Sequence, residues 1–337
     1  MKKLFAFLLT LTISICFSQN FSVSKKINLP GDGGWDYLSV DDINQNLFVS
    51  HGDVVHVVSL KTNTFVATIE DTKGVHGIAI ASDLNKAFIS CGKDNSISVV
   101  DLLNFKLLEK VKIDGQKPDA ILYDKFSKQV FIFNAKSNNT TILNAVSNKI
   151  IKNIALGGKP EFAVTNDKGL IYVNIEDENQ IKVIDTKTLQ VTAIFSILPG
   201  DEPSGLAFDK SNNRLFSVCG NQMMVVVDAK SGKIIQNIPI GDDCDGVVFD
   251  AKRKLIFAAN GEGTMTVIKQ NSKDSYSVLD TVLTQKGART IALNPSSGII
   301  YTTTPEFGAK PEPKPENPKP RLSIISNSFS VLVIEKK

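Results

Sequence analysis

The sequence has little of what most catalytic and metal-binding motifs require. Its 337 residues include 3 histidines, 4 cysteines and 1 tryptophan. No C-x-x-C-H pattern is present, which argues against covalently attached haem. The absence of G-x-S-x-G and H-E-x-x-H removes the common signatures of serine hydrolases and zinc proteases. Charges are scattered rather than gathered into a basic stripe, so no nucleic-acid partner is expected.

Helical periodicity and long apolar runs are also missing beyond the N-terminus. Two lysines precede an apolar run at 4–17, which is too short to span a bilayer. Residues 1–18 are therefore predicted to be a secretory signal cleaved after Ser18, and the mature protein to be periplasmic or secreted without a membrane span. Anchoring as a lipoprotein through Cys16 is the alternative, but Ile15 stands where that pattern normally has a small residue.

What the chain does contain is a sevenfold repeat. The repeated segments are WDYLSV from Trp35, VHGIAI from Val75, PDAILY from Pro118, PEFAVT from Pro160, PSGLAF from Pro203, CDGVVF from Cys244 and ARTIAL from Ala288. They begin at intervals of 40, 43, 42, 43, 41 and 44 residues. Such a period is typical of β-propellers, in which each repeat forms one four-stranded blade. The sequence therefore predicts an all-β, seven-bladed β-propeller.

Each repeat contains four short runs that favour strands. In residues 75–117 these are GIAIA, KAFISC, SISVVDL and KLLEKVKI, separated by Asn, Asp, Gly and Ser residues that favour turns. A glycine recurs after the fourth run, and we expect it to supply a positive φ between blades. The recurring glycines are Gly34, Gly74, Gly115, Gly157, Gly158, Gly200, Gly241 and Gly287.

The two ends of the chain predict how the ring closes. The C-terminal SFSVLVIEKK resembles a third strand with no fourth strand after it, and the N-terminal FSVSKKINLPGDGG resembles a fourth strand. We expect the N-terminal strand to complete the last blade, which would remove open sheet edges and make 19–337 one domain. A proline-rich insertion at 304–321 interrupts the last blade, as a lid, a docking arm or a tolerated surface loop.

The repeats also carry a family resemblance. QIKVIDTKTLQVTAIFSI and MMVVVDAKSGKIIQNIPIGDDCDGVVFD resemble the YVTN-type repeats of YncE-like β-propeller proteins, over nearly the whole mature chain. The resemblance implies an exported propeller and no particular activity. The WD dipeptide of WD40 repeats occurs once, at Trp35–Asp36, where it opens a first strand instead of ending a third. The single tryptophan argues against quinoprotein propellers.

The second position of each repeat is the first candidate site. It holds Asp36, His76, Asp119, Glu161, Ser204, Asp245 and Arg289. Because first strands line the channel of a propeller, these side chains are predicted to ring one mouth. Four converging carboxylates repel one another unless a cation such as Ca²⁺, a proton or pairing with Arg289 relieves them. The alternative is that strand starts are polar because they border loops.

A second candidate lies in the first two blades. His51 and His76 are predicted to approach one another on one face, where either Cys91 or Asp36 would complete a group of three ligands that suits Zn²⁺ or copper. Ordinary polar contacts are the alternative, and His56 is expected to point elsewhere. Cys219 and Cys244 hold the same relation in the fifth and sixth blades. They are predicted either to form a disulfide or to be small buried hydrophobic residues.

With no recognisable catalytic group, the sequence favours an exported binding or interaction module. Its ligand or protein partner would bind at the channel mouth, and a divalent cation is the one cofactor that the ring suggests. The alternative is a metal-dependent, lactonase-like hydrolase. In that hypothesis His76 is the general base, and the channel cation is held by Asp36, Asp119, Glu161 and Asp245.

Overall fold

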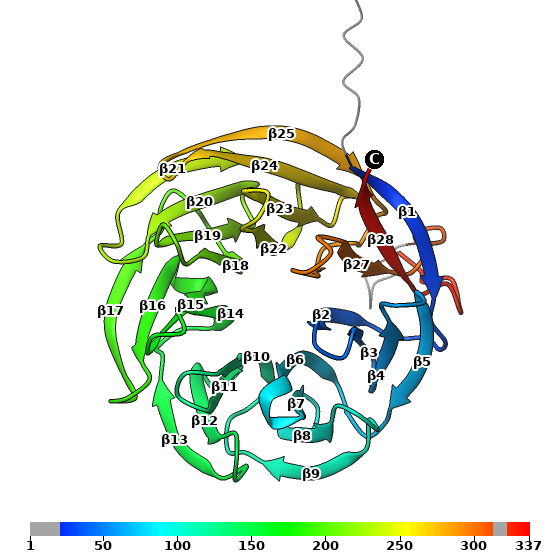
Figure 1. Ribbon diagram of the computed structural model, residues 1–337, viewed down its shortest axis with the longest axis horizontal. Helices are drawn as coiled ribbons and strands as arrows, with labels where there is room; N and C mark the ends of the chain where they lie inside the picture. Colours follow the sequence, from blue (N-terminus) through cyan, green and yellow to red (C-terminus); the bar gives the residue numbers. More distant parts are fainter. Residues whose placement is uncertain (1–20, 313–321) are drawn as a thin grey trace, which may run out of the picture.

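The computed structural model describes residues 21–312 and 322–337. These residues form a ring of seven four-stranded antiparallel sheets around a central channel (Figure 1). The predicted seven-bladed propeller is therefore confirmed. The predicted signal at 1–18 lies outside the described residues, as does 313–321 of the proline-rich insertion.

Each of the first six blades is built from four consecutive strands, numbered from the channel outward. Blade 1 has β2 (Trp35–Asp41), β3 (Asn46–His51), β4 (Val54–Ser59) and β5 (Thr64–Ile69). Blade 2 has β6 (Val75–Ala81), β7 (Lys86–Cys91), β8 (Ser96–Asp101) and β9 (Leu107–Lys112). Blade 3 has β10 (Pro118–Asp124), β11 (Gln129–Asn134), β12 (Asn139–Asn144) and β13 (Ile150–Ala155).

The second half of the ring repeats this order. Blade 4 has β14 (Pro160–Thr165), β15 (Leu170–Ile175), β16 (Gln180–Asp185) and β17 (Gln190–Ser196). Blade 5 has β18 (Pro203–Asp209), β19 (Arg214–Cys219), β20 (Met223–Asp228) and β21 (Ile234–Pro239). Blade 6 has β22 (Cys244–Asp250), β23 (Leu255–Asn260), β24 (Thr264–Ser272) and β25 (Ser275–Leu283). Blade 7 has β26 (Ile291–Leu293), β27 (Ile300–Thr304), β28 (Ser330–Lys336) and β1 (Phe21–Asn28).

The hydrophobic core lies between neighbouring blades. The second and third strands of a blade are buried almost throughout, because they pack against the adjacent blade on either face, whereas the fourth strands at the rim are largely exposed. One core cluster, for example, joins Phe48 of blade 1 to Ile89 of blade 2. Each blade therefore depends on its neighbours for burial, as expected of a repeat fold.

The ring closes through the N-terminal strand, as predicted. β1 runs antiparallel to β28, from the pair Phe21 and Lys336 to the pair Asn28 and Ser330. Figure 1 shows β1 in blue lying outside β28 in red. Phe21 is 1% exposed and meets the Phe257 ring edge-on at 5.2 Å, which ties the clasp to blade 6.

A register irregularity at the start of each first strand positions the channel mouth. In blades 1 to 6 the pairing between the first and second strands shifts directly after the first residue. A bulge of this kind bends the strand and re-aims a side chain. In each of these blades the second position of the repeat lies at this irregularity.

The recurring glycines serve two purposes instead of the single one predicted. Positive φ angles occur at Gly74, Gly157 and Gly287. The other five do not use that region, so the prediction was wrong for Gly34, Gly115, Gly158, Gly200 and Gly241. At Gly115 the reason is space, because a Cβ there would collide with the side chain of Asn134.

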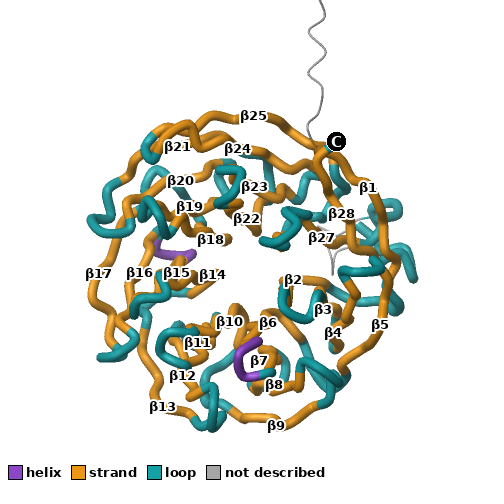
Figure 2. The backbone as a smooth tube through the Cα atoms, viewed as in Figure 1, coloured by secondary structure: helices purple, strands orange, loops and turns teal. Residues whose placement is uncertain are grey.

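Helix is almost absent from the described part of the chain, as the missing periodicity predicted. Two single-turn 3₁₀ segments, η1 (Ser82–Leu84) and η2 (Glu176–Glu178), are the helical elements there (Figure 2). No helix among the described residues has the length and apolar character needed to cross a bilayer.

Candidate ligand site at the channel mouth

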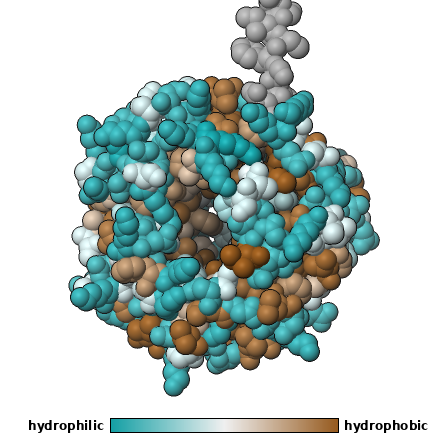
Figure 3. All heavy atoms as spheres, in the orientation of Figure 1, coloured by the Kyte–Doolittle hydropathy of each residue, from teal (hydrophilic) through white to brown (hydrophobic). Residues whose placement is uncertain are grey.

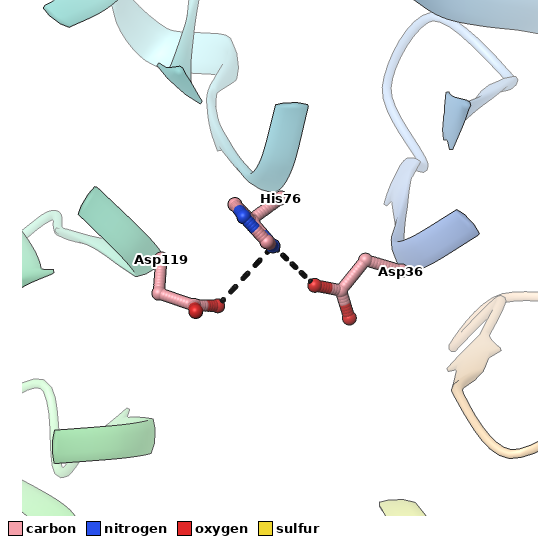
Figure 4. Close-up of side chains that lie close together, drawn as sticks. All are labelled: Asp36, His76 and Asp119. Carbon is pink, nitrogen blue, oxygen red and sulfur yellow. Dashed lines mark hydrogen bonds and ion pairs between the residues drawn. The ribbon is translucent and has the colours of Figure 1, made fainter. Parts of the chain in front are cut away.

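Three of the predicted ring residues come together in consecutive blades. Asp36, His76 and Asp119 extend from β2, β6 and β10 and point toward one another (Figure 4). His76 Nδ1 lies 2.7 Å from Asp36 Oδ2 and 3.7 Å from Asp119 Oδ1. Within 21–312 and 322–337, this is the one group of three His, Cys, Asp or Glu residues whose ligand atoms all lie within 4.8 Å of one another.

The other two ring carboxylates have cationic partners of their own. Lys159 Nζ lies 2.8 Å from Glu161 Oε1, and Arg289 Nε lies 2.5 Å from Asp245 Oδ2. Ser204 also donates a hydrogen bond of 3.0 Å to Asp245 Oδ1. The ring is therefore divided into three separate groups, and the hypothesis that four carboxylates hold one cation is not what the geometry shows. Pairing with Arg289, one of the predicted means of relief, does occur.

The charged side chains at the mouth are buried, and their partners compensate their charges only in part. Burial, followed by the charge of Asp36, raises the pKa of Asp119 to about 6. Burial, followed by the charge of Asp119, raises the pKa of Glu161 to about 8. Burial acts in the opposite sense on His76, but its hydrogen bond to Asp36 and the charge of Asp119 outweigh it and raise that pKa. Near neutral pH the mouth therefore retains protons that isolated side chains would release.

Buried hydroxyl groups hold the backbone that carries this cluster. The Asp36 amide donates to Ser50 Oγ at 3.0 Å, and its carbonyl accepts from Thr290 Oγ1 at 2.7 Å. Ser90 Oγ donates to the Asp119 carbonyl at 2.5 Å. These bonds connect the first strands to the second strands and to the neighbouring blades, so the positions of the ring residues are set by the fold.

Directly below the mouth the channel is narrow and apolar. The Tyr37 and Phe162 rings, from blades 1 and 4, lie 5.3 Å apart and meet across the channel. A cavity of about 270 Å³ beside them is lined mainly by apolar first-strand residues. Figure 3 shows the hollow at the centre of the ring with brown, apolar side chains inside it. The predicted polar channel is therefore polar at its mouth and apolar beneath.

Tyr37 is a site residue that the sequence interpretation missed. Burial, followed by the charge of Glu161, raises its pKa well above the usual value, so the hydroxyl stays protonated. The third position of the other repeats is small except at Phe162, and it holds Gly77, Ala120, Gly205, Gly246 and Thr290. Two aromatic residues at a repeat position that otherwise holds small residues indicate a contact across the channel.

Two cavities flank the mouth on either side of Trp35 and Arg289. One, of about 490 Å³, is lined by Asp36 and His76 and by Lys93 and Lys117. The other, of about 780 Å³, is lined by acidic, basic and apolar residues: Asp243, Asp245, Lys286, Phe307, Lys310, Leu322 and Ile324. The Arg289 guanidinium lies 5.4 Å from the centre of the Trp35 ring, so an aromatic and cationic wall separates the two.

The described ends of the proline-rich insertion lie beside this mouth. Phe307 and Ile324 form an antiparallel bridge, and both line the larger cavity. The Phe307 ring is 5.9 Å from the ring of Trp35, whose Nε1 donates to the Gly287 carbonyl at 3.0 Å. The insertion therefore begins and ends at the wall of the candidate ligand site.

The second candidate group is not assembled. His76 belongs to the mouth cluster, while His51 Nδ1 lies 3.1 Å from His56 Nε2, contrary to the expectation that His56 points elsewhere. The His51 ring stacks on Phe329 at 3.9 Å, and its Nε2 is buried without a hydrogen-bond partner in the described chain. Burial lowers the pKa of His51 to about 4. Cys91 lies in the blade 1–2 core, with Ser98 as its hydroxyl neighbour.

The cysteines of blades 5 and 6 behave as buried hydrophobic residues. Cys219 and Cys244 are buried free thiols in this structure, as the alternative expects, and the disulfide between them stays a prediction. Their Sγ atoms contact carbonyl oxygens two residues away in the chain. Burial raises the pKa of Cys219 to about 12 and raises the pKa of Cys244 well above its usual value, so neither presents a reactive thiolate.

Comparison with known proteins identifies the fold and no family. No family model matches this chain, and no curated protein matches its sequence. Hydrazine synthase from Kuenenia stuttgartiensis is similar in structure, with a TM-score of 0.71 and 15% identity over 80% of this chain and 92% of that one.

Two further solved structures are similar over more of the chain. The WD40 repeats of RRP9 match with a TM-score of 0.78 and 9% identity over 94% of this chain and 99% of that one. U3-55K matches with a TM-score of 0.75 and 9% identity over 92% and 99%. At these identities the likeness concerns the seven-bladed, WD40-like fold alone. The resemblance to YncE-like proteins stays a prediction.

Proposed function

We propose that this chain is an exported, non-catalytic binding module whose ligand or protein partner docks at the channel mouth. The main support for the proposal is that charged side chains with incomplete pairing and the aromatic ring of Trp35 lie together at this mouth. Two cavities of about 490 and 780 Å³ open on either side of Trp35 and Arg289. Concave sites with a few convergent polar groups are where ligands usually bind.

The WD40-like fold supports the same proposal in general terms. A propeller is a rigid disc on which loops and strand ends present a fixed surface. The WD40 repeats among the structural neighbours agree with an interaction module at the level of fold, while function depends on the site itself. Export is supported by the N-terminal sequence at 1–18, and membership of the YncE-like group by the repeat resemblance.

Binding is a better account of this geometry than the hydrolase alternative in which four ring carboxylates hold one cation and His76 is the general base. A lactonase-like mechanism needs a shared cation and a basic histidine. Glu161 and Asp245 are instead paired with Lys159 and Arg289. His76 has a raised pKa, which favours the protonated imidazole that a general base must avoid.

Charge reversal on the two faces of the ring tests the proposal. Lys93→Glu with Lys117→Glu changes the exposed basic groups of the mouth cavity. Lys125→Glu with Lys187→Glu is the matched control, because both are exposed in turns at the opposite ends of the strands. We expect molecules bound to the wild-type protein to be lost from the mouth variant and retained by the control. Retention by the mouth variant together with loss from the control would overturn the proposal.

A further inference from the structure

The mouth cluster has a donor set that differs from the carboxylate ring expected from the sequence. It offers one imidazole nitrogen and two carboxylates from three consecutive blades. Zn²⁺ is bound by such nitrogen and oxygen donors at about 2.0 to 2.2 Å, usually in tetrahedral geometry. Ca²⁺ takes six to eight oxygen ligands, roughly, and the cluster supplies too few.

The spacing of the donor atoms suits a small tetrahedral cation. Two ligands about 2.1 Å from a tetrahedral Zn²⁺ lie roughly 3.3 to 3.4 Å from each other. The separations from His76 Nδ1 to the two carboxylates, 2.7 Å and 3.7 Å, lie on either side of that value. Reaching that value would lengthen the shorter separation by about 0.6 Å and shorten the longer one by about 0.4 Å, and all three donor atoms already lie within 4.8 Å of one another.

Asp119 provides an independent indication that the cluster is incomplete. Its side chain is 9% exposed and points into the group. Its carboxylate accepts no hydrogen bond among the described residues, since the nearest cationic groups, on His76 and Lys117, lie 3.7 Å and 3.9 Å away. His76 Nδ1 lies closer to Asp36, at 2.7 Å, and a metal ion bound at this nitrogen would displace any proton shared there. A buried carboxylate without a close partner is costly unless an ion or a proton completes its environment.

The surroundings fix the ligands and leave one side open. The His76 ring lies beside Gly92, where a Cβ would be 2.9 Å from its Cδ2 atom and 3.0 Å from its Nε2 atom. The backbones of Asp36 and Asp119 are held by buried hydroxyl groups, including that of Ser90. The cavity of about 490 Å³ borders Asp36 and His76, so water or a ligand atom can reach the ion. Three protein ligands with one accessible position is the arrangement of an open zinc site.

We propose that Asp36, His76 and Asp119 form a three-ligand Zn²⁺ site at the channel mouth, with a fourth coordination position open to the adjoining cavity. The site adds a metal to the binding face and stands independently of the proposed partner, because metal binding is measured on the purified chain alone. Lys93 and Lys117 line the same cavity. They would favour an anionic group, such as a carboxylate, as the fourth ligand.

The test is Zn²⁺ binding by the untagged, chelator-treated protein, followed by calorimetry and by competition with a chromophoric chelator. Asp119→Asn, Asp36→Asn and His76→Gln remove one ligand each and nearly preserve side-chain volume. Glu161→Gln and Asp245→Asn are matched controls for the rest of the ring, and His51→Gln controls for the other histidine pair. Circular dichroism and thermal unfolding identify any variant that fails to fold, and the remaining ligand variants then decide.

We expect one Zn²⁺ per chain, an affinity loss of more than about 100-fold in each ligand variant, and changes within about threefold in the controls. Co²⁺ bound in place of Zn²⁺ should show the intense visible absorption of a tetrahedral site. No Zn²⁺ binding by the wild-type protein at about 0.1 mM would overturn the proposal. Equal loss in Glu161→Gln would overturn it in favour of a larger carboxylate site, and loss confined to His51→Gln would place the metal elsewhere.

Discussion

The buried histidine pair at the ring closure should make the propeller less stable in mild acid. His51 lies where β3 ends, stacked on Phe329 and bonded to His56, and it is 2% exposed. The charged groups that face it are His56, whose own pKa burial lowers, and Asp32 in the clasp loop. Asp32 accepts hydrogen bonds from Ser326 and Asn327, so its carboxylate is already engaged.

The magnitude follows from the pKa difference between the folded and unfolded states. The pKa of His51 falls from 6.5 to about 4 on folding, because burial disfavours the imidazolium. Between these values the unfolded chain binds more protons, so the free energy of unfolding decreases as the pH decreases. From about pH 7.5 to about pH 5, His51 alone accounts for a loss of about 2 kcal/mol. His56 acts in the same direction.

Urea unfolding at the two pH values, on wild type and on His51→Leu, measures this contribution. The variant should lose about 2 kcal/mol less than wild type over the same pH interval. Phe329→Leu is the control, since it removes the stacked ring and retains both imidazoles. It should be less stable at both pH values and keep most of the pH dependence. If His51→Leu and wild type show the same pH dependence within about 0.5 kcal/mol, the reasoning is refuted.

Three further substitutions test packing by the same urea measurement. Phe21→Ala empties a 1% exposed position of the clasp and should cost about 3 to 5 kcal/mol, and a cost under about 1 kcal/mol would mean that β1 is not needed for closure. Gly77→Ala places a Cβ 2.8 Å from the Asp119 carbonyl and should cost about 1 to 3 kcal/mol, whereas unchanged stability would contradict the close approach. Arg214→Ala removes a residue that is 5% exposed and whose Nη1 lies 2.5 Å from Asp228 Oδ2. It should cost about 2 to 3 kcal/mol, and a neutral result would show that the pair does not brace the blade.

The repeat period was enough to predict most of the fold. Short β-type runs recurring with a period of 40 to 44 residues leave few architectures other than a propeller, because each run needs a neighbour on both faces. The unpaired third strand at the C-terminus likewise required a partner, and the N-terminal run was the one segment of matching type. These predictions succeeded because the repeat pattern and the need to pair each strand decide them, even for the closure, whose paired strands lie at opposite ends of the chain.

The sequence predicted which residues line the channel mouth, namely the second position of each repeat. It predicted fewer of the contacts between them. Lys117 and Lys159 each stand two residues before a carboxylate of the ring. This spacing indicates local charge pairing, which the second positions of the repeats do not show by themselves. The contact of His51 with His56 follows from the β3–β4 register, which pairs Val49 with His56 and so places the two imidazoles diagonally on one face. Which carboxylate keeps a partner depends on side-chain packing between blades, and no sequence period encodes that.

The most direct test of the central claim, that the channel mouth is the binding face, is site-specific photo-crosslinking in the cells that produce the protein. The photoreactive side chain replaces Lys93 or Lys117 at the mouth and, for comparison, Lys125 or Lys187 on the opposite face. We predict covalent adducts from the two mouth positions and none from the opposite face. Adducts confined to the opposite face, or equal from both, would contradict the account.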